Sequence, residues 1–205
     1  NIDFNEVHKR LENIDESKRT LSNIFDELFC TYSEKHSPDS KIWGDKTPMN
    51  TMYLDWLGSV FPESKFIHIV RDGRDVASSY LKMERYETIL EAANRWTNSI
   101  DLAQAFGSKI KENYMEIRYE DMVTNPEGSI KKVCDFIGIN YNSDMLDHTS
   151  QVEKLGDTDK AHHSNLSKPI SSDSIGKWKH NLSESDQESI TKLLHKPLLR
   201  LGYVD

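Results

Sequence analysis

The chain has 205 residues, of which 36% are hydrophobic, and its 26 Lys and Arg against 34 Asp and Glu give a formal net charge of −8. This acidity argues against a general nucleic-acid-binding protein, which needs an excess of basic charge. The two cysteines, Cys30 and Cys134, are too few for a disulfide framework and are not spaced as metal ligands. Because no apolar run is long enough to span a bilayer, we expect a single domain, residues 1–205, without a membrane segment.

The first 70 residues are expected to form helices followed by one strand. Apolar residues at helical spacing predict helices over 2–35, interrupted near 13–17, and a further helix over 50–61 after a loop at 37–40. The run 65–70 is short, rich in β-branched and aromatic residues, and stops abruptly at a charged turn. This pattern predicts the clearest strand of the sequence.

The rest of the chain alternates between predicted helices and one more strand. Helices are expected over about 74–82, 88–106 and 183–194, and a strand over 113–119. Residues 125–127 supply a capping residue, a first-turn proline and a first-turn carboxylate, so another helix is expected to begin there and to end at Gly138. Residues 142–176 are polar and predict a loop. Strands that alternate with helices indicate an α/β fold with a parallel sheet.

A basic residue directly follows the predicted strand 65–70. Arg71 would lie at the carboxyl end of a parallel strand, where α/β sheets bind ligands and where the next helix presents its N-terminal amides. An arginine can hold a phosphate through two parallel hydrogen bonds, and Ser79 in the following helix can add a hydroxyl donor. The alternative is that Asp72 and Arg74 merely pair on a surface turn.

A second candidate anion-binding residue is Lys46, in the segment 44–48. Pro48 restricts Thr47 to extended geometry and sets up the next helix, so Lys46 would stand at the start of that helix. This position suits a lysine that holds an anionic leaving group. The alternative is a solvated lysine in a loop.

A third basic group gathers around one tryptophan near the end of the chain. Lys168, Lys177 and Lys179 lie near Gly176 and Trp178 in an otherwise acidic sequence. The tryptophan can stack on a planar ring, and lysines and backbone amides can bind phosphate. The alternative is a helix cap in which Trp178 anchors the C-terminal segment.

These motifs occur in one order along the chain, together with two more. The set comprises Lys46–Pro48, Val70–Arg74 with Ser79, Arg118–Asp121, Gly176–Trp178 and Leu201–Tyr203. With this set, residues 41–205 resemble sulfotransferases that use 3′-phosphoadenosine 5′-phosphosulfate. The chain is more similar to the bacterial and tyrosylprotein branch than to the cytosolic small-molecule branch. The resemblance implies a helix-rich, P-loop-like fold of the sulfotransferase type, with a parallel sheet flanked by helices.

The resemblance also implies roles for the residues that match the cofactor site. Arg71 and Ser79 match the pair that binds the 3′-phosphate of the cofactor, and Tyr119 matches a tyrosine near the adenine. Lys177 matches a lysine of a late loop that covers the nucleotide. Lys168 matches a lysine nine positions earlier.

The implied reaction transfers a sulfuryl group to a hydroxyl or amine acceptor and leaves adenosine 3′,5′-bisphosphate. Lys46 matches a lysine near the transferred group, so we expect it to be catalytic and to offset charge that develops on the leaving oxygen. Trp96 resembles a recurrent packing tryptophan and is expected in the core. No metal is required, and we interpret the run His162–His163 as part of a solvated loop rather than as a metal site.

One motif of the family is missing from the sequence. The family begins with a strand–loop–helix of Arg-Ser-Gly-Thr-Thr character, which cradles the 5′-phosphosulfate much as a P-loop holds phosphates. The only glycines before Arg71 are Gly44 and Gly58, and neither is followed by a Ser/Thr pair. We therefore expect that the first βα unit is missing and that residues 1–205 are an N-terminally incomplete domain. The alternatives are a catalytically incomplete nucleotide-binding fragment and a P-loop-like nucleotide kinase.

The motifs do not specify the acceptor or the assembly. A small molecule, a glycan or a peptide is compatible with them as acceptor, and so is a homodimer, whereas nucleic acid is not expected as a partner. Low cysteine use and the lack of a predicted membrane segment favour a cytoplasmic, bacterial protein.

Overall fold

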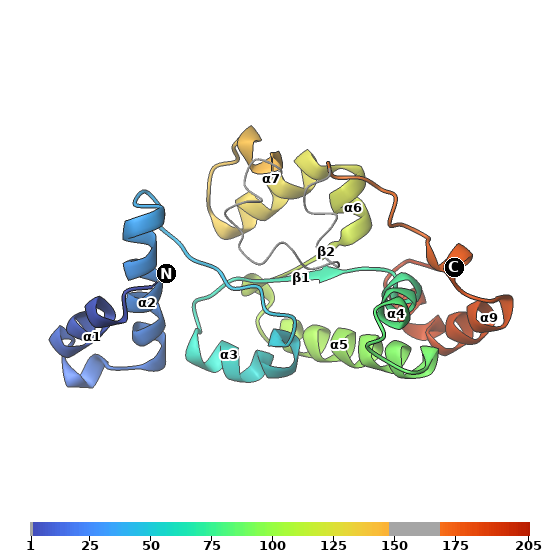
Figure 1. The fold of residues 1–205 in the computed structure, drawn as a ribbon, viewed down its shortest axis with the longest axis horizontal. Coiled ribbons are helices and arrows are strands. Elements are labelled where there is room, and N and C mark those ends of the chain that lie inside the picture. Colours follow the sequence, from blue (N-terminus) through green and yellow to red (C-terminus); the bar gives the residue numbers. More distant parts are fainter. Residues whose placement is uncertain (1, 148–168) are drawn as a thin grey trace. The chain divides into compact units, whose positions relative to one another are not determined.

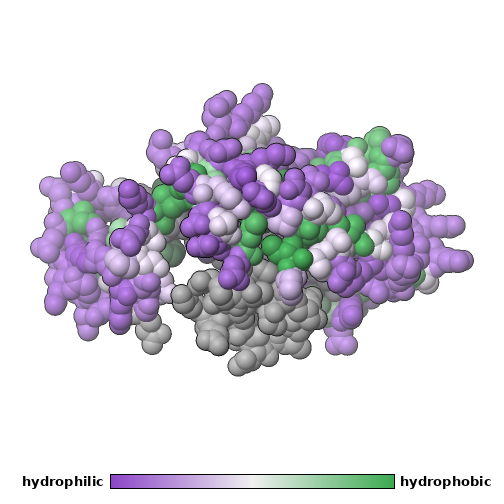
Figure 2. All heavy atoms as spheres, turned by 90° about the horizontal axis from the view of Figure 1, so that it is seen from above, coloured by the Kyte–Doolittle hydropathy of each residue, from purple (hydrophilic) through white to green (hydrophobic). Residues whose placement is uncertain are grey.

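The structure, a computed structural model, describes residues 2–147 and 169–205. The chain divides into two compact units, residues 1–64 and 65–205, and each unit is described by itself. Most of the surface seen in Figure 2 is hydrophilic, with hydrophobic residues in smaller patches between, as the low apolar fraction of the sequence implies.

The N-terminal unit begins with two helices that pack against each other. They are α1 (Phe4–Asn13) and α2 (Leu21–His36), separated by a 3-10 turn at Glu16–Lys18. The side chains of Asp3 and Thr20 accept backbone N–H groups and cap the two helices. Between the helices, the guanidinium of Arg10 binds the carboxylate of Glu34. The predicted helices and the predicted break between them are confirmed.

Aromatic rings hold the second half of this unit together. The ring of Trp43 stacks on Phe29 at 4.2 Å between centroids and meets Phe61 edge-on at 5.6 Å. A 3-10 turn, Asn50–Tyr53, leads into α3 (Leu54–Val60). The helix predicted over 50–61 is therefore confirmed in place, but its first turn is of the tighter 3-10 form.

The sheet of the second unit contains two parallel strands within the described residues. The strands are β1 (Phe66–Val70) and β2 (Tyr114–Arg118), paired in the register Phe66 to Tyr114 and Val70 to Arg118. The predicted parallel sheet is confirmed. Because parallel strands end at the same edge, this register brings Arg71 and Tyr119 to one end of the sheet.

Two helices follow β1 and build the main core. They are α4 (Gly73–Lys82) and α5 (Ile89–Lys109), which pack on each other and on α9 (Glu184–Leu193). Thr88 and Glu91 form a reciprocal capping box at the start of α5. The buried residues of α5 are half small and half large, those of α9 and α10 (His195–Arg200) are aliphatic, and Trp96 is among them, as expected. Figure 1 shows α5 along one side of the sheet.

The other side of the sheet carries helices that follow β2. They are α6 (Tyr119–Thr124) and α7 (Pro126–Ile137), which lie on the opposite side from α5 in Figure 1. Shorter elements are 3-10 turns at Lys111–Asn113 and Ser143–Leu146, and α8 (Trp178–Asn181). The predicted strand 113–119 was one residue too long at each end, because Asn113 ends a 3-10 turn and Tyr119 already opens α6. Gly138 ends α7 in the left-handed region at a φ of 78°, as predicted.

Throughout residues 2–147 and 169–205, no helix has the length and apolar character needed to cross a bilayer.

Candidate functional site

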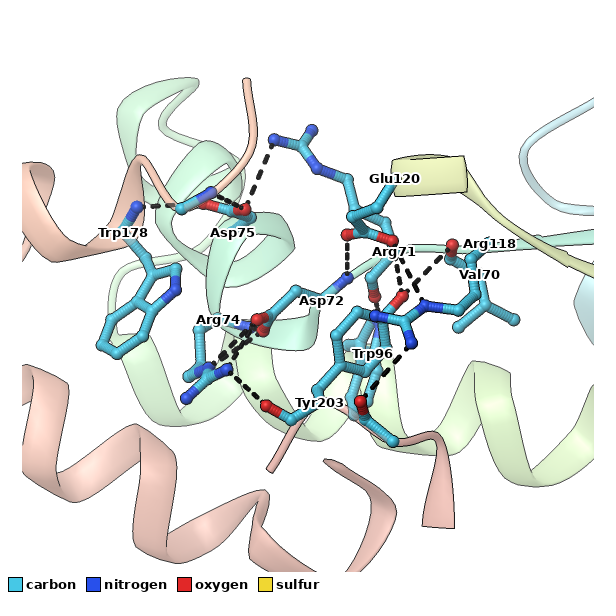
Figure 3. Close-up of polar contacts among 12 residues, drawn as sticks. Val70, Arg71, Asp72, Arg74, Asp75, Trp96, Arg118, Glu120, Trp178 and Tyr203 are labelled. Atoms are coloured by element: carbon cyan, nitrogen blue, oxygen red, sulfur yellow. Dashed lines mark hydrogen bonds and ion pairs between the residues drawn. The ribbon is translucent and has the colours of Figure 1, made fainter. Parts of the chain in front are cut away.

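The backbone at the end of β1 is held by side chains from two helices, and a C-terminal tyrosine holds one of these side chains. The indole Nε1 of Trp96, on α5, donates a hydrogen bond to the carbonyl of Arg71 at 3.1 Å. The backbone N–H of Asp72 donates to Oε1 of Glu120, on α6, at 3.0 Å. The hydroxyl of Tyr203, near the C-terminus, donates to Oε2 of the same carboxylate at 2.7 Å (Figure 3). The backbone of residues 71–72, directly after the strand, is therefore held in place by the protein itself, without a ligand.

Tyr203 is itself enclosed by charged groups. The guanidinium of Arg118 lies over its ring at 4.1 Å and donates to the carbonyl of Gly202. Burial, together with the hydrogen bond to Glu120, raises the pKa of the Tyr203 hydroxyl far above its ordinary value. The hydroxyl is thus a neutral donor at all physiological pH values.

The first turn of α4 neutralises two of its own charges. Asp72 caps the helix by accepting the backbone N–H of Arg74 at 2.9 Å. It also accepts from the Arg74 guanidinium, at 3.0 Å from Nε and 2.7 Å from Nη2. The pair considered from the sequence therefore exists, but it is buried, with side chains only 10% and 11% exposed. This pairing leaves the other arginine of the turn, Arg71, without Asp72 as a partner.

The Arg71 side chain points away from that pair, toward the segment 174–178. Its Nη2 donates to the backbone carbonyl of Ser174, and its guanidinium lies over the ring of Tyr119 at 4.8 Å. The Nε is buried and has no hydrogen-bond partner among the residues that the structure describes. A carboxylate, that of Asp75, lies 4.0 Å from Nη2. The Arg71 side chain is thus held in place, and its Nε donor has no acceptor among the described residues. Such a donor suits an anionic ligand.

Asp75 joins the segment 174–178 to the first turn of α4. Its side chain is fully buried, and its two oxygens accept the backbone N–H groups of Gly176, at 2.7 Å, and Trp178, at 2.9 Å. The ring of Trp178 lies under the Arg74 guanidinium at 4.3 Å (Figure 3). Trp178 is therefore the anchor that the sequence suggested, because both its backbone and its ring are held by α4.

Some of the predicted site residues come together in this arrangement. Arg71 and Tyr119 are in contact, and the segment that carries Lys177 is bound to the same helical turn. The Lys177 side chain is exposed. Ser79 lies in the second turn of α4, with its hydroxyl 3.7 Å from the sulfur of Met83.

Two predicted residues belong to other parts of the chain than the unit and residues described for this cluster. Lys46 belongs to the N-terminal unit and is exposed, in a turn where Asp45 accepts hydrogen bonds from Thr47 and Asn50. Lys168 lies outside the described residues, as does the run His162–His163. Their roles stay predictions.

Sequence reasoning missed the three acidic and aromatic residues that support the site. Asp75, Glu120 and Tyr203 each belong to a quoted motif or directly follow one, yet none was assigned a role. Their partners lie between 48 and 133 residues away along the chain, so no local pattern exposes the contacts. One signal was available in the sequence. Asp72 can already cap the helix that follows it, so Asp75 in the first turn of the same helix is available for another partner.

Comparison with known proteins adds independent observations. A sequence profile described as the sulfotransferase family matches residues 4–143. The chain is 24% identical over 206 residues to protein-tyrosine sulfotransferase 1 of Danio rerio, covering 95% of this chain and 57% of the relative. It is 23% identical to the Homo sapiens protein of the same name, covering 95% and 55%. The chain spans about half the length of the curated relatives that it matches.

Two solved structures share the fold. The sulfotransferase domain from the curacin biosynthetic pathway superposes with a TM-score of 0.61 and 23% identity, covering 92% of this chain and 77% of that one. The sulfotransferase domain of the Synechococcus PCC 7002 olefin synthase gives a TM-score of 0.62 and 19% identity, covering 92% and 73%. The predicted helix-rich, P-loop-like architecture of the sulfotransferase type is confirmed.

The predicted location of the protein is wrong. Low cysteine use and the lack of a predicted membrane segment favoured a cytoplasmic protein. The matching relatives include protein-tyrosine sulfotransferases of Danio rerio, Gallus gallus and Homo sapiens, and the likeness to these animal enzymes contradicts a cytoplasmic, bacterial protein. Cysteine count is a weak guide to compartment, because a domain of this size can build its core without disulfides.

Proposed function

The chain belongs to the sulfotransferase family, and we propose that it binds 3′-phosphoadenosine 5′-phosphosulfate and acts in sulfuryl transfer to the hydroxyl of a protein or peptide tyrosine. The observation that carries the proposal is the environment of Arg71. This guanidinium lies at the carboxyl end of β1, and its buried Nε has no hydrogen-bond partner among the described residues. The neighbouring Asp72 does not bind it, because that carboxylate pairs with Arg74. A phosphate oxygen is the acceptor that such a donor suits.

The residues present fit the nucleotide part of this cofactor. Arg71 and Ser79 would hold the 3′-phosphate, and Tyr119 would lie near the adenine. Lys177 and Lys168 would contribute charge from the late segment. The chemistry of these groups matches the ligand, because a guanidinium, a hydroxyl, an aromatic ring and ammonium groups serve a phosphorylated nucleoside.

The chain's own residues would act mainly by binding and by placing charge. When bound, the cofactor supplies an activated sulfuryl group on a phosphate leaving group. Arg71 would anchor the nucleotide away from the reacting end, so that this remote binding energy orients the sulfuryl donor. Lys46 would offset negative charge on the leaving oxygen. Its place relative to Arg71 is part of the proposal, because the two residues belong to different units.

The acceptor class follows from the names of the relatives. Several relatives that cover 95% of this chain carry the name protein-tyrosine sulfotransferase. We therefore propose a tyrosine hydroxyl ahead of a small-molecule or glycan acceptor. The proposal does not depend on whether the protein is a homodimer.

Calorimetric titration with adenosine 3′,5′-bisphosphate tests the nucleotide site. We expect Arg71→Ala to weaken binding about 30-fold or more, since paired hydrogen bonds to a charged group contribute roughly 2 kcal/mol or more. Arg71→Lys should recover only part of the affinity, because an ammonium lacks the planar fork. The matched control is Arg200→Ala, which removes an exposed arginine that pairs with Asp101 and should leave affinity unchanged.

Transfer itself is tested with a labelled sulfuryl donor and a panel of tyrosine, serine and sugar acceptors. Label on the tyrosine peptide, lost with Arg71→Ala and kept with Arg200→Ala, would support the proposal. An Arg71→Ala chain that binds the bisphosphate as tightly as the unaltered chain would overturn the phosphate assignment.

A further inference from the structure

We propose that Asp75 is a positioning residue of the nucleotide site, and that it acts by fixing the backbone on both sides of Lys177. The inference rests on the proposed function, since it concerns how that same site is assembled. Asp75 itself would not touch the nucleotide. Its role would be to set the place from which the Lys177 ammonium reaches an anion.

The first observation is that the hydrogen bonds of this carboxylate lead away from its own helix. An aspartate in a first turn commonly caps the helix through a backbone N–H of the same turn. In α4, Asp72 already performs this task by accepting the N–H of Arg74. Both oxygens of Asp75 instead accept N–H groups that are 101 and 103 residues distant in sequence. The carboxylate is thus committed to a long-range contact.

The second observation is that the contact brackets one residue. Gly176 and Trp178 donate to the two oxygens, at 2.7 and 2.9 Å, and Lys177 lies between them. Gly176 has a φ of 71°, a left-handed conformation that only glycine adopts readily, and an added Cβ would meet no atom within 4 Å. The backbone conformation that the turn adopts, rather than space for a side chain, is therefore the reason for a glycine here.

The third observation is that the backbone around Lys177 is held in place, whereas the Lys177 side chain is exposed. The Trp178 ring is held under the Arg74 guanidinium at 4.3 Å, and Arg74 is itself bound by Asp72. The Lys177 side chain, in contrast, is exposed. An ammonium on a rigid base can reach a ligand while losing less conformational freedom than one on a mobile loop.

The charge of Asp75 argues for positioning and against direct contact with a phosphate. A bare carboxylate would repel an anionic ligand. Here two N–H groups occupy both oxygens, and the Arg71 guanidinium lies 4.0 Å away. Arg71 also donates to the carbonyl of Ser174, two residues before Gly176. Figure 3 shows Arg71, Trp178 and the segment before it converging on this single carboxylate. The direct hydrogen bonds of Asp75 are thus to the backbone around Lys177, and its role concerns the position of that lysine.

A double-mutant cycle on the full chain tests this role, with adenosine 3′,5′-bisphosphate as the probe. We expect Asp75→Ala and Lys177→Ala each to weaken binding by about tenfold, as loss of a charged hydrogen-bonding group does. If Asp75 acts through Lys177, adding Asp75→Ala to Lys177→Ala should weaken binding by less than about twofold more. Additive losses in the double variant, or a Lys177→Ala chain with unchanged affinity, would overturn the inference.

A second measurement does not depend on binding and covers the case in which Asp75→Ala fails to fold. Asp75→Asn preserves the shape of the side chain but leaves only one oxygen for two N–H donors. We expect amide hydrogen exchange at Gly176 and Trp178 to accelerate at least tenfold in this variant, with exchange in the core of α5 unchanged. The matched control is Asp101→Asn, on the exposed surface of α5. Unchanged exchange at both amides would show that Asp75 does not hold this part of the backbone, and would overturn the inference.

The two proposals fail in different ways. If the unaltered chain does not bind the bisphosphate at all, the proposed function fails and the inference with it. If the unaltered chain binds and Arg71→Ala does not, but the effects of Asp75→Ala and Lys177→Ala simply add, only the inference fails.

Discussion

Removal of one oxygen atom, by Tyr203→Phe, should show how far the C-terminus supports the site. The Tyr203 hydroxyl donates to Glu120 at 2.7 Å, and the other oxygen of that carboxylate holds the backbone N–H of Asp72 at 3.0 Å. A hydrogen bond to a charged group contributes roughly 1.5 to 3 kcal/mol. Because the tyrosine is only partly buried, we take the lower end and expect a loss of about 1.5 kcal/mol in the free energy of unfolding.

The pH dependence of this loss has a definite sign. Burial and Glu120 raise the pKa of Tyr203 above its ordinary value of 10.0. An acid whose folded-state pKa is raised stabilises the fold fully below its unfolded pKa, and that contribution is lost as the pH rises beyond it. The difference between the unaltered chain and Tyr203→Phe should therefore be constant from pH 7 to about 9 and shrink above pH 10.

Urea unfolding at pH 8 and at pH 10.5, followed by tryptophan fluorescence, measures both effects. Tyr53→Phe is the matched control, because it removes the same atom from an exposed side chain and should change neither value. If Tyr203→Phe is as stable as the unaltered chain at pH 8, or if the difference grows at pH 10.5, the hydrogen bond to Glu120 is not the support described here.

Two further predictions concern the core and the sheet. Gly73→Ala should lower the free energy of unfolding by about 2 kcal/mol in thermal or urea unfolding, because the new Cβ would lie 2.7 Å from the ring of Trp96 and 2.9 Å from Leu194, and overpacking of a filled core is destabilising. Glu116→Gln should lower the free energy of unfolding at pH 6 more than at pH 3.5. The hydrogen bond from His68 lowers the pKa of Glu116 below its ordinary value of 4.5. The stabilisation by the Glu116 carboxylate is therefore present above pH 4.5 and is lost as the pH falls through the folded-state pKa. A variant with the same deficit at both pH values would contradict this reasoning.

Local signals in the sequence were sufficient to place most helices and both strands. Helix starts such as Asn125–Pro126 and the capping pair Thr88 and Glu91 act within a few residues, so their consequences can be read directly. The end of β2 could not be read in this way. Tyr119 continues the alternation of the strand, but the two acidic residues after it favour a helix start, and the helix prevails. The helix α10 was missed because no loop separates it from α9.

The candidate site was predictable only where chemistry follows from position along the chain. Arg71 could be found because it stands directly after a strand, at an edge where parallel sheets bind ligands. The supports of Arg71 could not be found, since Trp96, Glu120 and Tyr203 reach its segment from 25, 48 and 133 residues away. Contacts at such separations depend on how the helices pack, which no short motif encodes.

The charges of the segment 71–75 explain how an acidic chain can present a site for an anion. The segment contains two arginines and two aspartates and is therefore neutral, in a chain whose net charge is −8. Asp72 and Arg74 neutralise each other in a buried pair, and the oxygens of Asp75 are occupied by two backbone N–H groups. Within residues 71–75, Arg71 alone has a buried side-chain donor without a hydrogen-bond partner among the residues that the structure describes. At physiological salt, charges are screened beyond a Debye length of about 8 Å, so the net negative charge of the chain repels a distant anion only weakly. Affinity for a nucleotide would therefore arise from directed hydrogen bonds such as those of Arg71, and not from long-range attraction.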